Sequence, residues 1–428
     1  ILLGTLLLML PVASQNGQSA GFLTSLFTAT SATCVTGLIV YDTFTKFTIF
    51  GQAVILMLIQ VGGLSLVTLA TFFGFALRKK VGFKSMMLAS ESVSLDQAAS
   101  ARRMINLVIC TSFGFELAGA IALAAVLVPR FGAGGIWMSV FTAISAFCNA
   151  GFDIFGFLGQ YGSLTPFADS WYILTIVMLL IICGGLGFVV WQNIQRRICE
   201  KKRLDVYSRL VLLITGLLVV LGTAVIAAAE WNNPETLGPM PVPEKLLCGF
   251  FQSVTFRTAG FNTIDLGAMT GMSKAASMLL MFIGGSSGST AGGIKTVTFG
   301  LLIIAAFRVA RGNRDVVVMK RRVDTGSLLR ALSITVISLM IICFGAFLIS
   351  LVDGITFEDV LFETFSAFGT VGVTTGVTTQ FSYFGKLLLM AMMFFGRVGI
   401  LTITYEIMIG LHSEKEPLRR PKAEFLIG

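Results

Sequence analysis

The sequence predicts an all-α polytopic membrane protein in which four repeats, each a span, a half-helix, a loop and a second span, surround a pseudo-fourfold pore. Three observations carry this prediction: an apolar composition, an alternation of basic and non-basic loops, and a fourfold internal repeat. Of 428 residues, 55% are hydrophobic and 12% are charged, and the mean hydropathy is +0.87. Soluble domains carry roughly 25% charged residues, so the composition excludes an ordinary soluble enzyme.

The net charge of +9 is concentrated in a few loops. Residues 78–103, 196–209, 308–330 and 415–422 hold 23 of the 31 Lys and Arg residues. These stretches alternate with apolar segments and with loops that are nearly free of Lys and Arg, which is the positive-inside pattern. We therefore expect the basic loops and the C-terminus to lie on the cytoplasmic side of the plasma membrane. We expect no nucleic-acid partner, because the basic residues follow this alternation.

Apolar segments of two lengths follow one another along the chain. After a shortened first span at 1–13, segments long enough to cross the bilayer are predicted at 49–77, 104–128, 171–194, 210–229, 275–307, 331–352 and 383–411. Shorter segments at 21–33, 136–147, 245–256 and 357–368 cannot cross and are predicted to be re-entrant half-helices. The predicted architecture thus has eight transmembrane helices and four re-entrant pore helices, in repeats 1–80, 81–203, 204–314 and 315–428, the last including a basic tail.

The four half-helices lead into loops of similar sequence. Aligned without gaps, these loops read LFTATSATCVTGL, VFTAISAFCNAGF, FFQSVTFRTAGF and LFETFSAFGTVGV. A phenylalanine stands ten positions before a glycine in every copy, the pairs being Phe27 and Gly37, Phe141 and Gly151, Phe250 and Gly260, and Phe362 and Gly372. The glycines are 114, 109 and 112 residues apart, and each copy ends on a second glycine mark: Gly62-Gly63, Gly184-Gly185, Gly284-Gly285 and Gly396-Arg397. Four matches in register predict fourfold pseudo-symmetry.

Such loops suit a cation. Half-helices that enter from the side opposite the basic loops point the negative ends of their dipoles toward mid-membrane, and an extended loop at that depth lines an aqueous path or packs in protein. Backbone carbonyls from four loops can replace the hydration shell of an alkali ion, and glycine permits the required torsions. Tight helix packing is the alternative reason for these glycines. The predicted filter residues are Val35, Thr36, Gly37, Asn149, Ala150, Gly151, Thr258, Ala259, Gly260, Thr370, Val371 and Gly372.

The sixth span contains a segment rich in glycine and serine, residues 284–293, which predicts a broken helix at mid-membrane depth beneath the filter. Broken helix there is tolerated beside a cavity, so the segment is a candidate gate, with a packing kink as the alternative. An extra residue between Gly293 and Lys295 departs from a phosphate-binding loop. The predicted gate comprises Gly284, Gly285, Ser286, Ser287, Gly288, Ser289, Thr290, Ala291, Gly292, Gly293, Lys295 and Arg397.

Charged residues inside apolar segments are costly and therefore functional candidates. Arg397 occupies the second glycine position of the fourth repeat, and we expect it to hold the gate closed. Arg257 and Glu363 are expected to buttress the filter together, and Glu116 is expected to pair with another helix.

The loops, the eight-span layout and the sequence GGSSGSTAGGIKT from Gly284 to Thr296 resemble the Trk/Ktr/HKT superfamily of potassium transporters over essentially the whole chain. The length is most similar to that of Ktr membrane subunits. The resemblance implies K⁺ bound at the filter carbonyls, stimulation by Na⁺, a homodimer and a cytosolic, nucleotide-binding regulatory ring of RCK type (KtrA-like). The uneven loop sequences predict less strict discrimination of K⁺ from Na⁺ than four identical loops would give.

Two other classes of function are alternatives. A secondary transporter, such as a cation symporter with alternating access, also uses broken helices, but typically as inverted pairs, whereas basic linkers give these repeats one orientation. An enzyme is not expected, because the single histidine, His412, lies beside the basic tail, and the seven cysteines stand singly. Neither a metal cluster nor a covalent cofactor is expected from this pattern.

Overall fold

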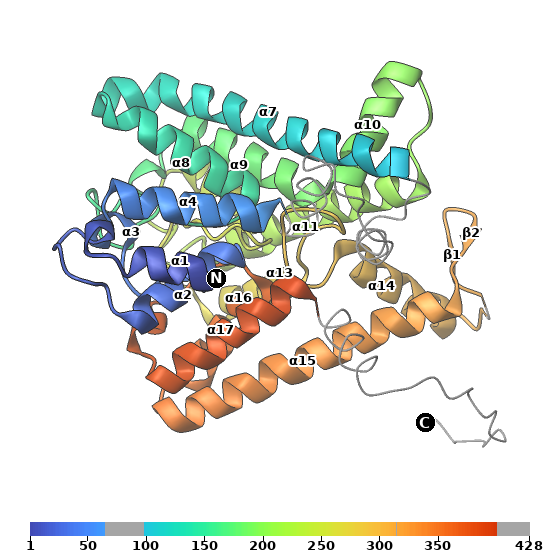
Figure 1. Cartoon of the computed structure of the whole chain (residues 1–428). Helices are drawn as coiled ribbons and strands as arrows, with labels where there is room; N and C mark the ends of the chain where they lie inside the picture. Colours follow the sequence, from blue (N-terminus) through green and yellow to red (C-terminus); the bar gives the residue numbers. More distant parts are fainter. Residues whose placement is uncertain (65–97, 314, 400–428) are drawn as a thin grey trace, which may run out of the picture.

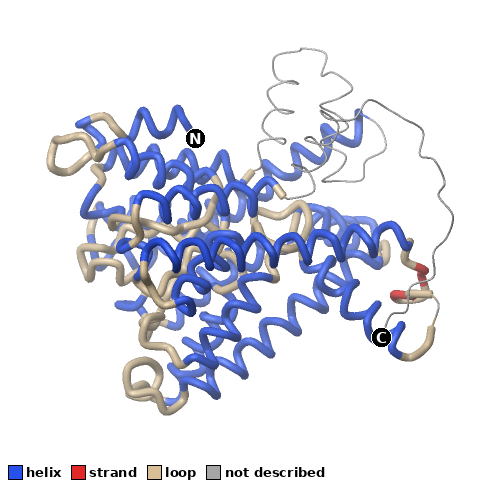
Figure 2. The backbone as a smooth tube through the Cα atoms, turned by 90° about the horizontal axis from the view of Figure 1, so that it is seen from below, coloured by secondary structure: helices blue, strands red, loops and turns tan. Residues whose placement is uncertain are grey.

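The computed structural model describes residues 1–64, 98–313 and 315–399, and these are almost entirely helical (Figures 1 and 2). The basic tail, most of the 78–103 cluster and the predicted repeat boundary at 80 lie outside the described residues. The elements of the first half are α1 (Leu2–Leu8), η1 (Pro11–Ala13), α2 (Phe22–Thr33), α3 (Thr43–Lys46), α4 (Ile49–Gly63), α7 (Ala98–Phe131), α8 (Gly134–Cys148), η2 (Thr165–Phe167), α9 (Trp171–Leu186) and α10 (Phe188–Glu200). Those of the second half are α11 (Val206–Glu230), α12 (Val242–Thr255), α13 (Gly271–Phe282), α14 (Thr296–Ala310), β1 (Val317–Val318), β2 (Arg321–Arg322), α15 (Thr325–Asp353), α16 (Phe357–Gly369), η3 (Val377–Gln380) and α17 (Tyr383–Val398).

Three of the described helices are long and apolar enough to cross a membrane: Ile105–Phe131 within α7, α11 and α15. The pair α9 and α10 adds a fourth if it is one broken span. Large apolar side chains such as Val220, Met340 and Leu351 lie exposed on α11 and α15, as lipid contact requires. The protein is therefore a helical membrane protein, while the full count of eight spans stays a prediction.

The predicted half-helices are short helices in the structure. The helices α2, α8, α12 and α16 have 12, 15, 14 and 13 residues. At ~1.5 Å rise per residue they extend about 18–23 Å, which is less than the ~30 Å of bilayer hydrocarbon. None of the four is therefore long enough to cross a bilayer.

The continuous helix predicted at 171–194 is wrong. The chain bends by 97° between α9 and α10, at Gly187, whose φ of +90° and ψ of 145° lie outside the helical region. The first residue of α10 is held by the segment between α13 and α14, because Phe188 N donates to Gly288 O at 2.9 Å. The predicted break in the sixth span is confirmed, since residues 283–295 separate α13 from α14.

The short helices lie inside a frame made by longer ones. In Figure 1, α7 runs along the upper edge of the molecule and α15 along the lower edge, with α2, α8 and α16 between them. Three of the short helices pack against a later helix of their own repeat and against a helix of a neighbouring repeat. The pairs are α4 and α17 for α2, α9 and α4 for α8, and α17 and α13 for α16. The fourth, α12, packs on α11 and α9. This arrangement brings the loops that follow the short helices to a common centre.

Candidate functional site: four converging loops

The four predicted filter loops share one backbone conformation. In each loop the residue two positions before the glycine has a left-handed φ: 56° at Val35, 60° at Asn149, 76° at Thr258 and 52° at Thr370. The glycines themselves have φ values of 93° at Gly37, 69° at Gly151, 87° at Gly260 and 92° at Gly372. Left-handed torsions are rare for β-branched residues and cost roughly 1–3 kcal/mol each, so the surrounding structure must impose them.

The four glycines meet one another in cyclic order. A Cβ added to Gly151 would lie 2.7 Å from both Ala259 O and Gly260 Cα, and one added to Gly260 would lie 2.5 Å from Val371 O. A Cβ on Gly372 would overlap Thr36 O, and a Cβ on Gly37 would overlap Ala150 O, which closes the cycle. The structure thus brings the predicted filter residues of all four loops together and places a backbone carbonyl against each glycine.

Hydroxyl groups at the ends of the half-helices hold these loops, although the repeated glycines alone do not point to them. Gly37 N donates to Ser31 Oγ and Gly372 N donates to Ser366 Oγ, both at 3.1 Å. In the other two loops the hydroxyl bonds the residue that follows the glycine: Ser145 Oγ donates to Phe152 O at 2.6 Å and Thr255 Oγ1 donates to Phe261 O at 2.7 Å. Each hydroxyl lies four residues after a fully buried phenylalanine, and this spacing is the signal that would have found them.

The ungapped alignment of the third loop is wrong by one residue. Phe27, Phe141 and Phe362 are fully buried, but Phe250 is 36% exposed and its neighbour Phe251 takes the buried position. The glycine stands five positions after the hydroxyl residue in the third loop and six positions after it in the other three loops. The hydrogen bonds agree: Ala150 N reaches back five residues to Ser145 O, whereas Ala259 N reaches back only four residues to Thr255 O.

Three of the second glycine marks serve close packing against the half-helices. A Cβ on Gly62, Gly184 or Gly396 would overlap a carbonyl oxygen in the last turn of a half-helix, those of Thr33, Phe147 and Phe368 respectively. Gly284 differs, because its Cβ would overlap Gly292 O within the glycine-rich segment itself.

The segment 283–295, which we call the intramembrane loop, contacts two of the filter loops. Thr290 Oγ1 donates to Phe147 O at 3.1 Å, one residue before the end of α8. A Cβ on Gly292 would overlap the side chain of Thr370 in the fourth filter loop. The loop closes on itself through Gly284 N, which donates to Ile294 O at 2.8 Å, and through Lys295 Nζ, which donates to Ala291 O at 2.9 Å.

Arg397 of α17 bridges two parts of this region. Its guanidinium donates to Thr290 O in the intramembrane loop and to Gly62 O at the end of α4. These contacts join the fourth repeat to the broken sixth span, as expected, and also to the first repeat. A planar guanidinium with several donors suits such a bridge, since each nitrogen addresses a different carbonyl.

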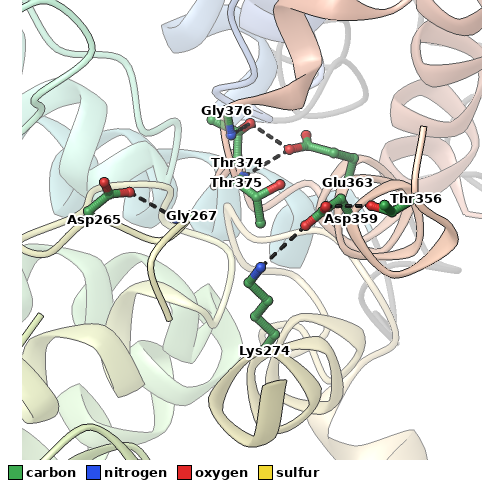
Figure 3. A network of polar contacts seen from close by, with 9 residues as sticks. All are labelled: Asp265, Gly267, Lys274, Thr356, Asp359, Glu363, Thr374, Thr375 and Gly376. Carbon is green, nitrogen blue, oxygen red and sulfur yellow. Dashed lines mark hydrogen bonds and ion pairs between the residues drawn. The ribbon is translucent and has the colours of Figure 1, made fainter. Parts of the chain in front are cut away.

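The expected joint buttress of Arg257 and Glu363 is wrong. Glu363 accepts hydrogen bonds from Thr374 Oγ1 at 2.5 Å and Thr375 N at 3.0 Å (Figure 3). It also accepts from Thr378 Oγ1 at 2.6 Å, so it braces the chain after the fourth filter loop. Arg257 Nη2 donates to Gly284 O at 3.4 Å, in the intramembrane loop. In the described part of the chain, the ion pairs are instead Lys202 with Glu200, Lys274 with Asp359, and Arg322 with Asp315.

Two other polar contacts connect separate helices. Glu116 of α7 is buried and accepts from Gln60 Nε2 of α4 at 2.9 and 3.1 Å, which supplies the helix partner expected from the sequence. Lys274 Nζ of α13 forms an ion pair with Asp359 Oδ1, in the first turn of α16, at 3.3 Å (Figure 3). Both contacts join helices assigned to different repeats.

Two carboxylates lie in the chain that follows the first and second filter loops. Asp42 accepts from Thr45 N at 2.9 Å and from Tyr161 N at 3.3 Å, while Asp153 accepts from Phe155 N at 3.1 Å. Burial raises the pKa of Asp153 from its ordinary value of 3.8 to about 7; the hydrogen bond from Phe155 N opposes this shift, and the charge of Asp42 adds to it. These loops therefore carry a carboxyl group that titrates near neutral pH.

Replacing Asp153 with asparagine is expected to raise the midpoint of thermal unfolding at pH 8 by about 2 °C, with little change at pH 4. Because the folded protein holds this proton more tightly than the unfolded chain does, stability falls as the pH rises from about 4 to about 7 and is level above that. Asparagine does not titrate, so the variant lacks this loss of stability between pH 4 and pH 7. The control is Asp169→Asn, at an exposed carboxylate nearby in the chain. A profile unchanged from that of the unsubstituted protein would contradict the assignment.

Comparison with known proteins gives consistent matches. The family model described as "TrkH: Cation transport protein" matches residues 2–417. The chain is 37% identical to the Ktr system potassium uptake protein B of Bacillus subtilis, over 100% of this chain and 94% of that protein. It is 36% identical to the potassium/sodium uptake protein NtpJ of Enterococcus hirae, again over 100% and 94%. The crystal structure of the potassium transporter TrkH from Vibrio parahaemolyticus aligns with a TM-score of 0.69 at 16% identity, covering 91% of this chain and 79% of that one.

Proposed function

The chain belongs to the TrkH family of cation transport proteins, and from this premise we propose that it takes up potassium ions through a channel-like pore at the four converging loops. The observation that carries the proposal is the cyclic contact of Gly37, Gly151, Gly260 and Gly372, each against a carbonyl oxygen of the next loop. Carbonyl oxygens gathered from four loops can replace the hydration shell of an alkali cation. The family is one of transporters and not of enzymes, and transport is the function assigned here.

The ion is proposed from the relatives and from the loop chemistry together. Both similar proteins named above are described as potassium uptake proteins, and NtpJ also as a sodium uptake protein. We therefore assign K⁺ as the transported ion. The family resemblance supports Na⁺ as an activator and the plasma membrane as the location. The family resemblance further supports a homodimer and a cytosolic RCK-type ring as the regulatory partner.

The intramembrane loop is proposed as the gate. It crosses from α13 to α14 while contacting the second and fourth filter loops, and Arg397 holds it to the end of α4. Non-helical backbone at membrane depth is tolerated where it lines a cavity or is buried in protein. Displacing this loop would therefore open the path beneath the filter.

A cation symporter with alternating access is the second candidate, because two helices, α9 with α10 and α13 with α14, are broken at their glycines. Against it, all four filter loops have the same torsions and meet in one cycle. A symporter requires a driving ion gradient, whereas a channel-like pore requires only the electrochemical gradient of the transported ion.

Rubidium uptake by purified protein in liposomes tests the proposal. We expect uptake driven by membrane potential alone, inhibited strongly by K⁺ and weakly by Na⁺. Gly260→Ser is expected to lower uptake at least tenfold and to reduce the preference for K⁺ over Na⁺, because a side chain there meets Val371 O. Uptake that occurs only with an imposed Na⁺ or H⁺ gradient would favour the symporter, and undiminished, selective uptake by Gly260→Ser would remove this glycine from the pathway.

A further inference from the structure

Arg257 is a buried cation that lacks an anionic partner among the described residues. The residue is 8% exposed and lies one position before Thr258 of the third filter loop. Its one hydrogen bond to the described chain is the 3.4 Å contact from Nη2 to Gly284 O, and its Nε has no partner there. Burying an unpaired guanidinium is costly, so such a group is normally compensated by a negative charge.

A small cavity lies beside this side chain. Arg257 and Thr215 of α11 both line it, and the rest of the lining is apolar side chains and glycine, including Ile181 and Gly285. The cavity has room for about one water-sized species. Its walls come from α9, α11, the end of α12 and the intramembrane loop, so it sits directly behind the third filter loop.

Thr215 supplies a second unused donor. The residue is 8% exposed, and its hydroxyl has no partner in the described chain. A threonine in a helix usually bonds the carbonyl one turn earlier, and Thr223 on the same helix does so, donating to Val219 O at 2.7 Å. Two orphan groups that can donate, one of them positively charged, therefore line one cavity.

We infer that this cavity binds a small monovalent anion of the halide class, such as chloride, between the guanidinium of Arg257 and the hydroxyl of Thr215. An anion only accepts hydrogen bonds, which matches two donors. A water molecule can also accept from two donors, but it carries no charge to offset the buried guanidinium. The site therefore favours an anion over water.

The bound anion neutralises a fixed positive charge behind a loop that is proposed to carry cations. In a low-dielectric interior an uncompensated guanidinium would repel a cation in the adjacent loop. Because Arg257 also contacts Gly284 O, the anion stabilises the attachment of the intramembrane loop to the third filter loop. Its occupancy is therefore expected to affect the stability of the fold as well as ion passage.

Thermal unfolding of the purified full-length chain in detergent tests the inference without any transport assay. The protein is measured in potassium chloride, potassium bromide and potassium gluconate at fixed K⁺ concentration and ionic strength. We expect a midpoint that rises saturably with chloride or bromide, and bromide density beside Arg257 in an experimentally determined structure. Equal midpoints in chloride and gluconate, or bromide density elsewhere only, would mean that water alone fills the cavity and would overturn the inference.

Two matched variants assign the effect to this site. Thr215→Val keeps the shape of the side chain, removes the hydroxyl and is expected to raise the half-saturating chloride concentration about fivefold. Thr223→Val, on the same helix, removes a hydroxyl that already has a partner, and it is expected to leave the half-saturating concentration unchanged. Arg257→Gln is expected to abolish the halide dependence. If both threonine variants respond to chloride as the unsubstituted protein does, the anion does not bind at Thr215 and the site is wrong.

Discussion

Replacing Gly372 with alanine is expected to reduce rubidium uptake about 100-fold or more, while the protein still inserts into the membrane. Gly372 has a φ of +92°, and a Cβ there would overlap Thr36 O and lie 2.8 Å from Gly37 Cα. Both obstacles are backbone atoms, which cannot move aside by changing a rotamer. An L-residue at this torsion costs roughly 1–2 kcal/mol, and relief of the overlap requires the first and fourth loops to separate. Initial uptake rates per reconstituted protein measure the loss.

The matched control is Gly376→Ala in the same loop. Gly376 has a φ of +98°, so alanine there meets the same torsional penalty, but no other atom of the described chain lies within 4 Å of its added Cβ. We expect this variant to keep most of the uptake. Equal loss in both variants would show that the torsion alone matters, and uptake retained by Gly372→Ala would show that the contact between the first and fourth loops is not needed for transport.

The local features of the site could be read from the sequence because glycine and helix length leave direct signals. A repeated glycine at nearly constant spacing predicted the left-handed torsions that Gly37, Gly151, Gly260 and Gly372 adopt. Segments of about a dozen apolar residues predicted short helices, since they are too few to cross a bilayer. The third loop was misaligned because Phe250 and Phe251 are adjacent, and composition alone does not show which ring is buried.

Tertiary partners left no such signal. The bend at Gly187 was missed because residues 171–194 have a continuous apolar pattern, and the bend depends on Gly288 O of a distant loop accepting from Phe188 N. Arg257 and Glu363 were paired because opposite charges in an apolar segment suggest it, yet each finds backbone or hydroxyl partners nearer to it. The partner of Glu116, Gln60, belongs to a different predicted repeat, and its identity required the packing of α7 against α4 to be known.

Replacing Arg397 with alanine is expected to increase rubidium flux about tenfold. The guanidinium donates to Thr290 O and Gly62 O, so it fastens the intramembrane loop to the end of α4. A hydrogen bond from a charged donor contributes about 1.5–3 kcal/mol, and losing one such contribution shifts an open–closed equilibrium by about tenfold or more. Flux through reconstituted protein, measured at equal membrane potential, reports this shift.

Two further variants separate the bridge from a general effect of charge. Arg397→Lys keeps the positive charge, but a single ammonium group lacks the planar fork that addresses two carbonyls, so its flux is expected to lie between those of the unsubstituted protein and Arg397→Ala. Lys386→Ala removes a positive charge from the exposed start of the same helix, where Nζ contacts only Thr379 O at 3.4 Å among the described residues, and is expected to leave the flux unchanged. If Arg397→Ala conducts no more than the unsubstituted protein, the bridge does not hold the gate closed. If Arg397→Lys matches the unsubstituted protein, positive charge alone is sufficient and the two-carbonyl geometry is not required.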